Sequence, residues 1–303
     1  MTQLRTIGIV GGGLMGTGIA EVAALAGFPV VVVKASGGDV GGLRDRIVKA
    51  MAGRVAKGKL AAEAAAAAES RLTFTTDLAA LAGCDLVIES IIEDLDAKRA
   101  LFARLEAIVG PTAVLASNTS TLKIADLASG RPDRTVGLHF FSPVPAMALV
   151  EIAHLPTTAP EVLAACEAFV AALGKTAVPV MDSTGFVVNR LLVPMLLGAI
   201  AAYEQRLAGA EQIDTAMRLG CGHPLGPLAL SDLIGLDVVY AMAKLLYKEF
   251  GDDRYRPPAL LRRLVQAGHL GKKTGLGLYD YAHKPPRANA GALVEVAAPS
   301  IAA

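Results

Sequence analysis

A histidine and a glutamate on neighbouring apolar runs are the side chains of this sequence best suited to moving a proton. His139 ends the run at residues 135–139, and Glu151 lies in a second run at residues 148–152. Two prolines between the runs predict a shaped loop, so we expect the runs to return side by side and the two side chains to meet. A carboxylate that accepts one ring N–H of an imidazole leaves the other ring nitrogen free to take a proton from a substrate hydroxyl.

A glycine-rich motif near the N-terminus has the spacing of a dinucleotide site. A β-branched run at residues 6–10 leads directly into GGGLMG, and a helical pattern follows over residues 17–26. Glycines permit the tight turn and the close approach of a pyrophosphate, which then lies at the positive N-terminus of the helix. We therefore predict cofactor contacts at Gly11, Gly13, Leu14, Met15 and Gly16.

The end of the second predicted strand indicates which dinucleotide binds. An NAD-binding fold usually has Asp or Glu there, which accepts a hydrogen bond from the ribose 2′-hydroxyl, but residues 30–33 are followed by Lys34. An ammonium group cannot accept that hydrogen bond and attracts a 2′-phosphate instead, and Ser36 offers a hydroxyl in the Ser-Gly-Gly turn. Lys34 and Ser36 therefore favour NADP, with NAD as the alternative.

Strands and helices alternate through the first part of the chain, which predicts an α/β fold with a Rossmann-type doubly wound sheet. Ligands of such sheets gather beyond the carboxyl ends of the strands. Four polar side chains follow or end predicted strands and are therefore expected on one rim: Glu89, Ser117, Asn118 and His139.

The remainder of the chain is predicted to be all helical. The expected division is a dinucleotide-binding Rossmann domain at residues 1–184 and a helical substrate and dimerisation domain at residues 185–303. The helical domain is small and strongly apolar, so we expect a homodimer formed through it.

Composition argues for a small-molecule partner. The chain has 303 residues, a net charge of +1 and 19% charged residues, so no basic field indicates nucleic acid. The three cysteines lack CxxC spacing, which argues against a disulfide framework and a metal site. The most apolar stretch, residues 185–202, contains an arginine and a proline, and no secretory signal pattern is present, so we expect no membrane segment and a cytoplasmic protein.

A basic helix is predicted at residues 43–60. Its cations include Arg54, Lys57 and Lys59. Two interpretations stay open, a solvated helix face or an electrostatic landing surface for a phosphorylated substrate carrier.

Six blocks of the sequence, in order, resemble the 3-hydroxyacyl-CoA dehydrogenase family, and most of all its short bacterial type that acts on 3-hydroxybutyryl-CoA. The blocks are GGGLMGTGIA, ASNTSTL, GLHFFSPVPAMALVEI, DSTGFVVNRLL, GHPLGPLALSDLIGLD and GKKTGLGLYDY. The resemblance implies that His139 is the general acid/base and Glu151 its orienting partner, and that Ser117 and Asn189 hydrogen-bond the substrate oxygen. It also implies that three residues face the nicotinamide half of the cofactor: Glu89, Lys98 and Asn118.

The resemblance implies an oxidoreductase that interconverts 3-hydroxyacyl-CoA and 3-oxoacyl-CoA thioesters. A typical family member has an acid where this chain has Lys34, so the resemblance favours NAD where the local chemistry favours NADP. Two further hypotheses stay open. The first is the same chemistry on a thioester carried by an acyl carrier protein, and the second is a non-catalytic dinucleotide-binding protein of the same fold.

Overall fold

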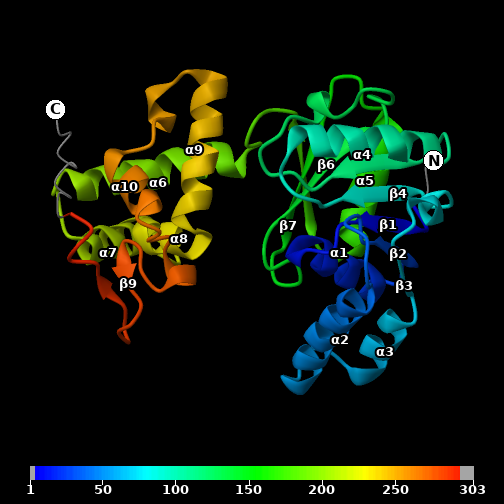
Figure 1. Ribbon diagram of the computed structural model, residues 1–303, viewed down its shortest axis with the longest axis horizontal. Helices are drawn as coiled ribbons and strands as arrows, with labels where there is room; N and C mark the ends of the chain where they lie inside the picture. Colours follow the sequence, from blue (N-terminus) through cyan, green and yellow to red (C-terminus); the bar gives the residue numbers. More distant parts are fainter. Residues whose placement is uncertain (1–3, 294–303) are drawn as a thin grey trace. The chain divides into compact units, whose positions relative to one another are not determined.

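The chain divides after Phe186 into two compact units with separate hydrophobic cores, as seen in this computed structural model, which describes residues 4–293 (Figure 1). The sequence pattern predicts this division two residues earlier, after residue 184. Within the described residues, no helix has the length and apolar character needed to cross a membrane.

The first unit contains eight strands. They are β1 (Ile7–Val10), β2 (Val30–Val33), β3 (Leu72–Thr75), β4 (Leu86–Glu89), β5 (Val114–Ser117), β6 (Thr135–Phe140), β7 (Leu149–His154) and β8 (Thr176–Met181). Its helices are α1 (Leu14–Leu25), α2 (Gly41–Ala56), α3 (Ala62–Glu69), α4 (Leu95–Ile108) and α5 (Pro160–Ala172), with the 3₁₀ turns η1 (Leu78–Leu81) and η2 (Ile124–Asp126).

The strands form one sheet in the order β3-β2-β1-β4-β5-β6-β7-β8, and neighbours run parallel except at β6 and β7. Apolar side chains of α1 and α5 pack on one face of the sheet, and those of α4 and η1 pack on the other. This layering confirms the predicted doubly wound α/β fold. Outside these layers, α2 and α3 extend away from the sheet (Figure 1).

The second unit is helical apart from a two-residue ladder between β9 (Tyr279–Asp280) and β10 (Arg287–Ala288). Its helices are α6 (Val188–Glu204), α7 (Ala210–Cys221), α8 (Pro227–Ile234), α9 (Leu236–Phe250) and α10 (Ala259–Gln266), with the 3₁₀ turns η3 (Asp253–Tyr255) and η4 (Lys272–Thr274). A largely apolar α6 packs against α8 and α9, as its sequence requires.

Two details differ from the sequence prediction. The strand β3 was not predicted, because it is a half-exposed edge strand of four residues that lacks a continuous apolar run. The basic helix predicted to reach residue 60 ends at Ala56, and Gly58 follows at a φ of 66°, a left-handed conformation that ends helices.

Two buried carboxylates connect the helices of the second unit. Asp232 in α8 accepts the backbone N–H groups of Leu278 and Tyr279 at 2.9 and 2.8 Å. Asp214 in α7 accepts the N–H of Leu228 in the first turn of α8 at 2.8 Å and the hydroxyl of Tyr279 at 2.8 Å. These carboxylates therefore hold α7, α8 and the C-terminal segment together.

The buried carboxyl group of Asp232 should make the free energy of unfolding depend on pH. Burial raises its pKa from 3.8 to about 6, although its two backbone hydrogen bonds act to lower it. The folded-state pKa lies above the unfolded value, so the stabilisation is complete below about pH 4 and is lost as the pH rises through about 6. Relative to Asp232→Asn, the free energy of unfolding of the wild type should fall by on the order of 1–3 kcal/mol between about pH 4 and pH 7, measured by urea denaturation. A difference that stays constant with pH would contradict this.

Candidate functional site

His139 and Glu151 lie directly opposite each other on the antiparallel strands β6 and β7. Side chains at opposed positions of such a pair lie on the same face and within reach of each other. The His139 Nδ1 and Glu151 Oε2 atoms are 2.8 Å apart, and both residues are buried. The meeting of these two side chains, predicted from the sequence, is therefore present. When Nδ1–H donates to the carboxylate, Nε2 is the nitrogen with a free lone pair.

Aromatic rings hold the imidazole from other directions. The ring centroid of Phe141 lies 4.4 Å from that of His139, and the centroid of Phe186 lies 5.7 Å away. These contacts restrict rotation of a ring that the Glu151 carboxylate already orients. Neither phenylalanine was predicted as a site residue, because an aromatic side chain beside a strand is usually part of the core.

Glu89 forms the polar centre of the neighbouring strand ends. The residue pairs in register with Ser117 on β5, and both side chains are fully buried. The hydroxyl of Ser117 donates to Glu89 Oε2 at 2.6 Å, and the Lys98 ammonium from α4 donates to Glu89 Oε1 at 2.5 Å. The backbone N–H of Ile91 donates to Oε1 at 2.7 Å. The structure thus brings together three of the predicted residues, Glu89, Lys98 and Ser117.

The single proton of the Ser117 hydroxyl is directed at Glu89, while its oxygen accepts the backbone N–H of Thr119 at 3.1 Å. One lone pair of that oxygen remains. In this arrangement Ser117 can accept a hydrogen bond from a ligand, and it can donate one only after its hydroxyl turns away from Glu89.

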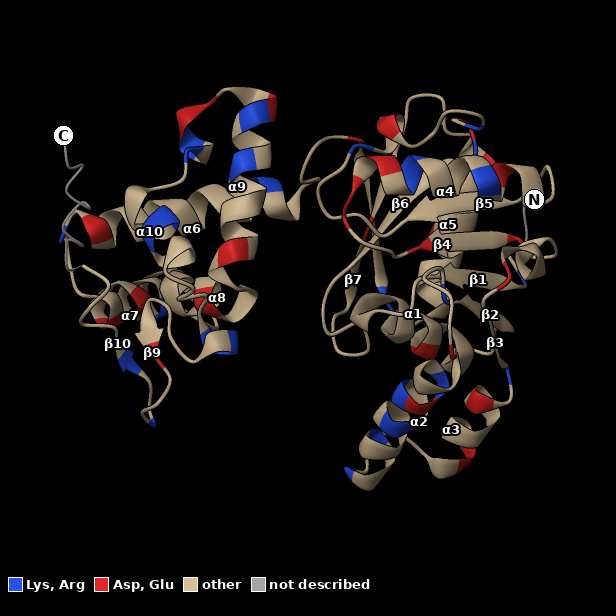
Figure 2. Cartoon of the chain, in the orientation of Figure 1, with Lys and Arg blue, Asp and Glu red and all other residues tan. Residues whose placement is uncertain are grey.

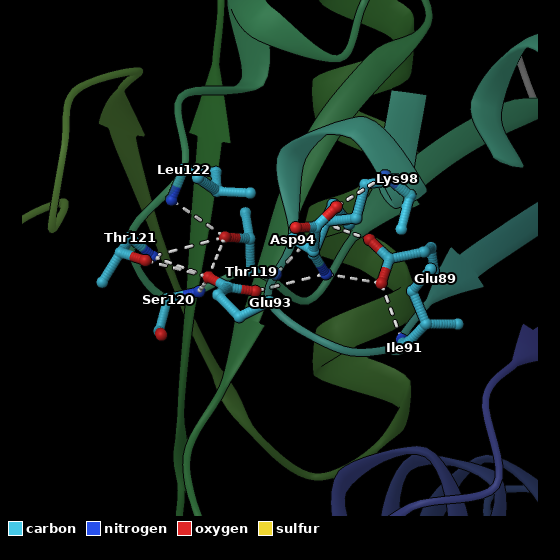
Figure 3. A network of polar contacts seen from close by, with 11 residues as sticks. Glu89, Ile91, Glu93, Asp94, Lys98, Thr119, Ser120, Thr121 and Leu122 are labelled. Carbon is cyan, nitrogen blue, oxygen red and sulfur yellow. Dashed lines mark hydrogen bonds and ion pairs between the residues drawn. The ribbon is translucent and has the colours of Figure 1, made fainter. Parts of the chain in front are cut away.

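A second carboxylate, Glu93, extends this network into the loop after β5 (Figure 3). Its Oε2 lies 3.2 Å from Lys98 Nζ, and its Oε1 accepts the hydroxyls of Thr119 at 2.5 Å and Thr121 at 3.0 Å. Burial acts to raise the pKa of Glu93, but the Lys98 charge and these hydrogen bonds outweigh it, so the pKa lies below its ordinary value. Glu93 was missed in the sequence because an acid beside a helix start is usually a solvated or capping group.

The two predicted asparagines occupy different units. Asn118 follows β5, and its side-chain oxygen accepts the backbone N–H of Phe140 at 2.9 Å, which fixes the end of β6 beside the end of β5. Asn189 lies in the first turn of α6 in the second unit.

The glycines of the motif between β1 and α1 serve two different purposes. A Cβ on Gly16 would collide with the carbonyl oxygen of Gly11, and a Cβ on Gly11, which has a φ of 127°, would collide with the carbonyl of Ser90. Packing within the protein therefore requires both. A Cβ on Gly13, by contrast, would meet no atom within 4 Å, so the protein itself does not require this glycine.

The start of α1 is open to an anionic ligand. Its N-cap, Gly13, supplies no side-chain cap and its first turn contains no acid, while Leu14 is 77% exposed. Helix N-termini bind phosphate through backbone N–H groups and the helix dipole. These residues could hold a dinucleotide pyrophosphate, which is the ligand that the sequence predicts for them.

The residues at the end of β2 lie in a turn. Lys34 is half-buried, and its ammonium donates to the carbonyl oxygen of Asp39 at 2.9 Å, while Ser36 is exposed in the same turn. The residue that directly follows β2 is therefore Lys34 and not an aspartate or glutamate.

The cations of α2 differ in their surroundings. Arg54 donates to the buried Glu21 of α1 at 2.7 Å, so this guanidinium holds α2 against α1. Lys57 and Lys59 are exposed beyond the end of the helix. Among the described residues, no group of three or more His, Cys, Asp or Glu side chains could hold a metal ion.

Comparisons with known proteins identify both units. A family model described as 3-hydroxyacyl-CoA dehydrogenase, NAD binding domain, matches residues 6–183, and the C-terminal domain model of the same family matches residues 185–281. The 3-hydroxybutyryl-CoA dehydrogenase of Mycobacterium tuberculosis H37Rv is 45% identical over 282 residues, which are 92% of this chain and 99% of the relative.

Two further relatives show the range of similarity. The 3-hydroxyadipyl-CoA dehydrogenase of Escherichia coli K12 is 41% identical over 284 residues, covering 93% of this chain and 60% of that protein. The crystal structure of (S)-3-hydroxybutyryl-CoA dehydrogenase from Ralstonia eutropha matches with a TM-score of 0.89 at 43% identity, covering 93% of this chain and all of that one.

The buried network around Lys98 predicts a large loss of stability when its cation is removed. Lys98→Met leaves the fully buried Glu89 carboxylate without its counter-charge, so the free energy of unfolding should fall by about 3–5 kcal/mol. Arg104→Met, at an exposed position of the same helix, should change it by less than about 0.5 kcal/mol. Chemical denaturation of both variants measures the two effects, and equal losses would refute the role of the buried pair.

Proposed function

The chain belongs to the 3-hydroxyacyl-CoA dehydrogenase family, and on that premise we propose that it interconverts 3-hydroxyacyl-CoA and 3-oxoacyl-CoA thioesters. The observation that carries this proposal is the buried pair of His139 and Glu151, whose side chains lie 2.8 Å apart on opposed strands. An oriented imidazole is the group needed to move the proton of a 3-hydroxyl.

His139 is the general acid/base in this proposal and Glu151 is its positioning residue. With Nδ1–H donated to Glu151, His139 Nε2 takes the proton of the substrate hydroxyl during oxidation and returns it during reduction. Glu151 also stabilises the imidazolium that forms, because its carboxylate is buried 2.8 Å from the ring. In the reducing direction His139 must begin protonated.

Ser117 and Asn189 are proposed to hydrogen-bond the substrate oxygen. The single proton of a 3-hydroxyl points at His139 Nε2, so Ser117 has to donate to the substrate oxygen and cannot accept from it. A 3-oxo group likewise needs a donor, so the Ser117 hydroxyl turns away from Glu89 in both directions of the reaction. Glu89, Lys98 and Asn118 are proposed to line the nicotinamide half of the cofactor.

A nicotinamide dinucleotide, when bound, would supply the hydride acceptor for oxidation at C3 of the substrate and the hydride donor for reduction. The residues proposed to hold it are the open start of α1 with Gly13 and Leu14, together with Gly11, Met15 and Gly16. Lys34 and Ser36 are proposed to favour NADP over NAD, because no carboxylate stands at the end of β2 to accept a ribose 2′-hydroxyl.

A short acyl chain is the proposed substrate. The relatives named as 3-hydroxybutyryl-CoA dehydrogenases support this, since the Mycobacterium tuberculosis protein is 45% identical and is matched over 99% of its length. An acyl carrier protein as the thioester carrier is the alternative. Of the three cations predicted to contact such a carrier, Arg54 is paired with Glu21, whereas Lys57 and Lys59 are exposed. Saturable activity with an acyl-carrier-protein substrate and none with the coenzyme A ester would favour that alternative.

The proposed roles predict the effects of substitutions at His139 and Glu151. We expect His139→Gln and Glu151→Gln to lower kcat for acetoacetyl-CoA reduction by about 10²–10⁴-fold, because proton transfer loses its carrier or its orientation. His154→Gln changes another histidine of the same hairpin, whose Nδ1 contact is a 3.4 Å approach to a backbone carbonyl, and should leave kcat within about twofold.

Initial rates with NADPH and with NADH measure these effects, with thermal unfolding as the control for folding. Wild-type rates in either Gln variant would contradict the acid/base assignment. The absence of a rate with either cofactor in the wild type would instead support the carrier-protein substrate or the non-catalytic hypothesis.

We also propose that the protein is a homodimer formed through the second unit. The helices α7 and α8 pack together, and they present Leu219 and Leu233 at 81% and 55% exposure. Apolar side chains exposed on neighbouring helices are typical of an interface.

Size-exclusion chromatography with light scattering should give twice the mass of the chain. The double substitution Leu219→Glu and Leu233→Glu should shift the protein toward monomer, since it places charges in an apolar contact. A monomeric wild type at micromolar concentration would remove this proposal.

A further inference from the structure

The carboxyl ends of β1 and β2 place two segments of the chain side by side. Val10 pairs with Val33 in the parallel register, and the backbone N–H of Gly11 donates to the carbonyl oxygen of Val33 at 3.0 Å. The glycine-rich loop and the turn that begins at Lys34 therefore leave the sheet from adjacent points. In a fold of this kind the adenosine ribose of a dinucleotide lies at that edge.

Lys34 brings one cation to this edge. Its ammonium donates one proton to the carbonyl oxygen of Asp39, which leaves two donors for a ligand. The turn beneath it contains Gly37 and Gly38, both with positive φ, and a Cβ on Gly38 would lie 3.5 Å from Lys34 Nζ. The Asp39 carboxylate is bound to the backbone N–H of Gly41 at the start of α2.

Arg46 brings a second cation from α2, which is rich in Lys and Arg (Figure 2). Leu43 packs so closely on Gly12 that a Cβ there would collide with it, and Arg46, three residues later, lies on the same helix face. One guanidinium nitrogen of Arg46 donates to the carbonyl oxygen of Gly12 at 2.8 Å. This bond fixes the guanidinium at the glycine-rich loop and leaves its other donors available.

The neighbouring Arg44 differs from Arg46 in its partner. It forms an ion pair with Glu69 of α3 at 2.7 Å, so its charge is compensated within the protein. Arg46 is bound to a neutral carbonyl oxygen instead.

We propose that Lys34 and Arg46 together form a binding site for a phosphate on the 2′ position of the adenosine ribose, and so select NADP. A phosphate monoester carries up to two negative charges and several acceptor oxygens, which match an ammonium and a guanidinium on its two sides. This inference rests on the proposed function, since it assigns the cofactor of the same reaction. Coenzyme A presents the same chemistry with its phosphate at the 3′ position, so a test has to separate the two.

Isothermal titration of the full chain with three adenosine nucleotides tests the site without turnover. We expect adenosine 2′,5′-bisphosphate to bind at least about tenfold more tightly than AMP or adenosine 3′,5′-bisphosphate, because only the 2′-phosphate reaches both cations. Arg46→Ala and Lys34→Ala should each weaken binding of the 2′,5′-bisphosphate by about tenfold and leave AMP binding within about twofold. Arg44→Ala, which removes the same charge from the same helix, should leave the 2′,5′-bisphosphate affinity unchanged.

Three results would overturn the inference. They are equal binding of AMP and the 2′,5′-bisphosphate by the wild type, tighter binding of the 3′,5′-bisphosphate, and an Arg46→Ala affinity equal to that of the wild type.

Initial rates of acetoacetyl-CoA reduction separate this inference from the proposed function. Efficient turnover with NADH and no preference for the 2′-phosphate would keep the dehydrogenase and remove the Lys34 and Arg46 site. A clear 2′-phosphate preference without turnover by either cofactor would keep the site and remove the proposed reaction. If the protein both turns over acetoacetyl-CoA and prefers the 2′-phosphate, the KM for NADPH should rise in Arg46→Ala while kcat stays unchanged. Lys34→Asp should then shift the cofactor preference toward NADH.

Discussion

The reversal of strand direction between β6 and β7 is the constraint on which the candidate site depends. The other neighbouring strands of the sheet run parallel, and their carboxyl ends deliver loops to one edge. The chain returns through residues 141–148 to the antiparallel neighbour β7, and this places Glu151 directly opposite His139 within the sheet. Because both partners lie on strands, their separation is fixed by the backbone ladder and not by the conformation of a loop.

The rest of the rim is fixed by charge. Glu89 and Lys98 are almost completely buried, and a buried ion pair is tolerated only when its remaining donors and acceptors are satisfied. Ser117 and the N–H of Ile91 satisfy Glu89, and Glu93 satisfies a further donor of Lys98. Glu93 in turn holds the loop after β5, so one network connects the ends of β4 and β5 with the start of α4. The loops that approach a ligand are therefore anchored by polar contacts within the protein.

The sequence predicted those parts of the fold and site that depend on local pattern. The glycine motif, the alternation of strands and helices and the His139 to Glu151 return each follow from residue type and short-range spacing. The edge strand β3, the pairing of Arg54 with Glu21 and the reach of Arg46 to Gly12 depend on tertiary packing, which periodicity does not encode. Arg46 illustrates the limit, since only the packing of Leu43 on the loop shows which face of α2 meets it.

The direction of the Ser117 hydroxyl connects this network to the proposed chemistry. Glu89 accepts the Ser117 proton in the resting site, so the hydroxyl has to turn before it can donate to a substrate oxygen. Turning that proton toward the substrate oxygen removes a hydrogen bond from a buried carboxylate, and this is tolerable because Lys98 and Ile91 still donate to Glu89. The same lysine that stabilises the fold therefore limits the energetic cost of presenting a donor to the substrate. On this argument, Lys98 affects the reaction in both directions, even though its ammonium is bound to carboxylates of the protein and not to the reacting atoms.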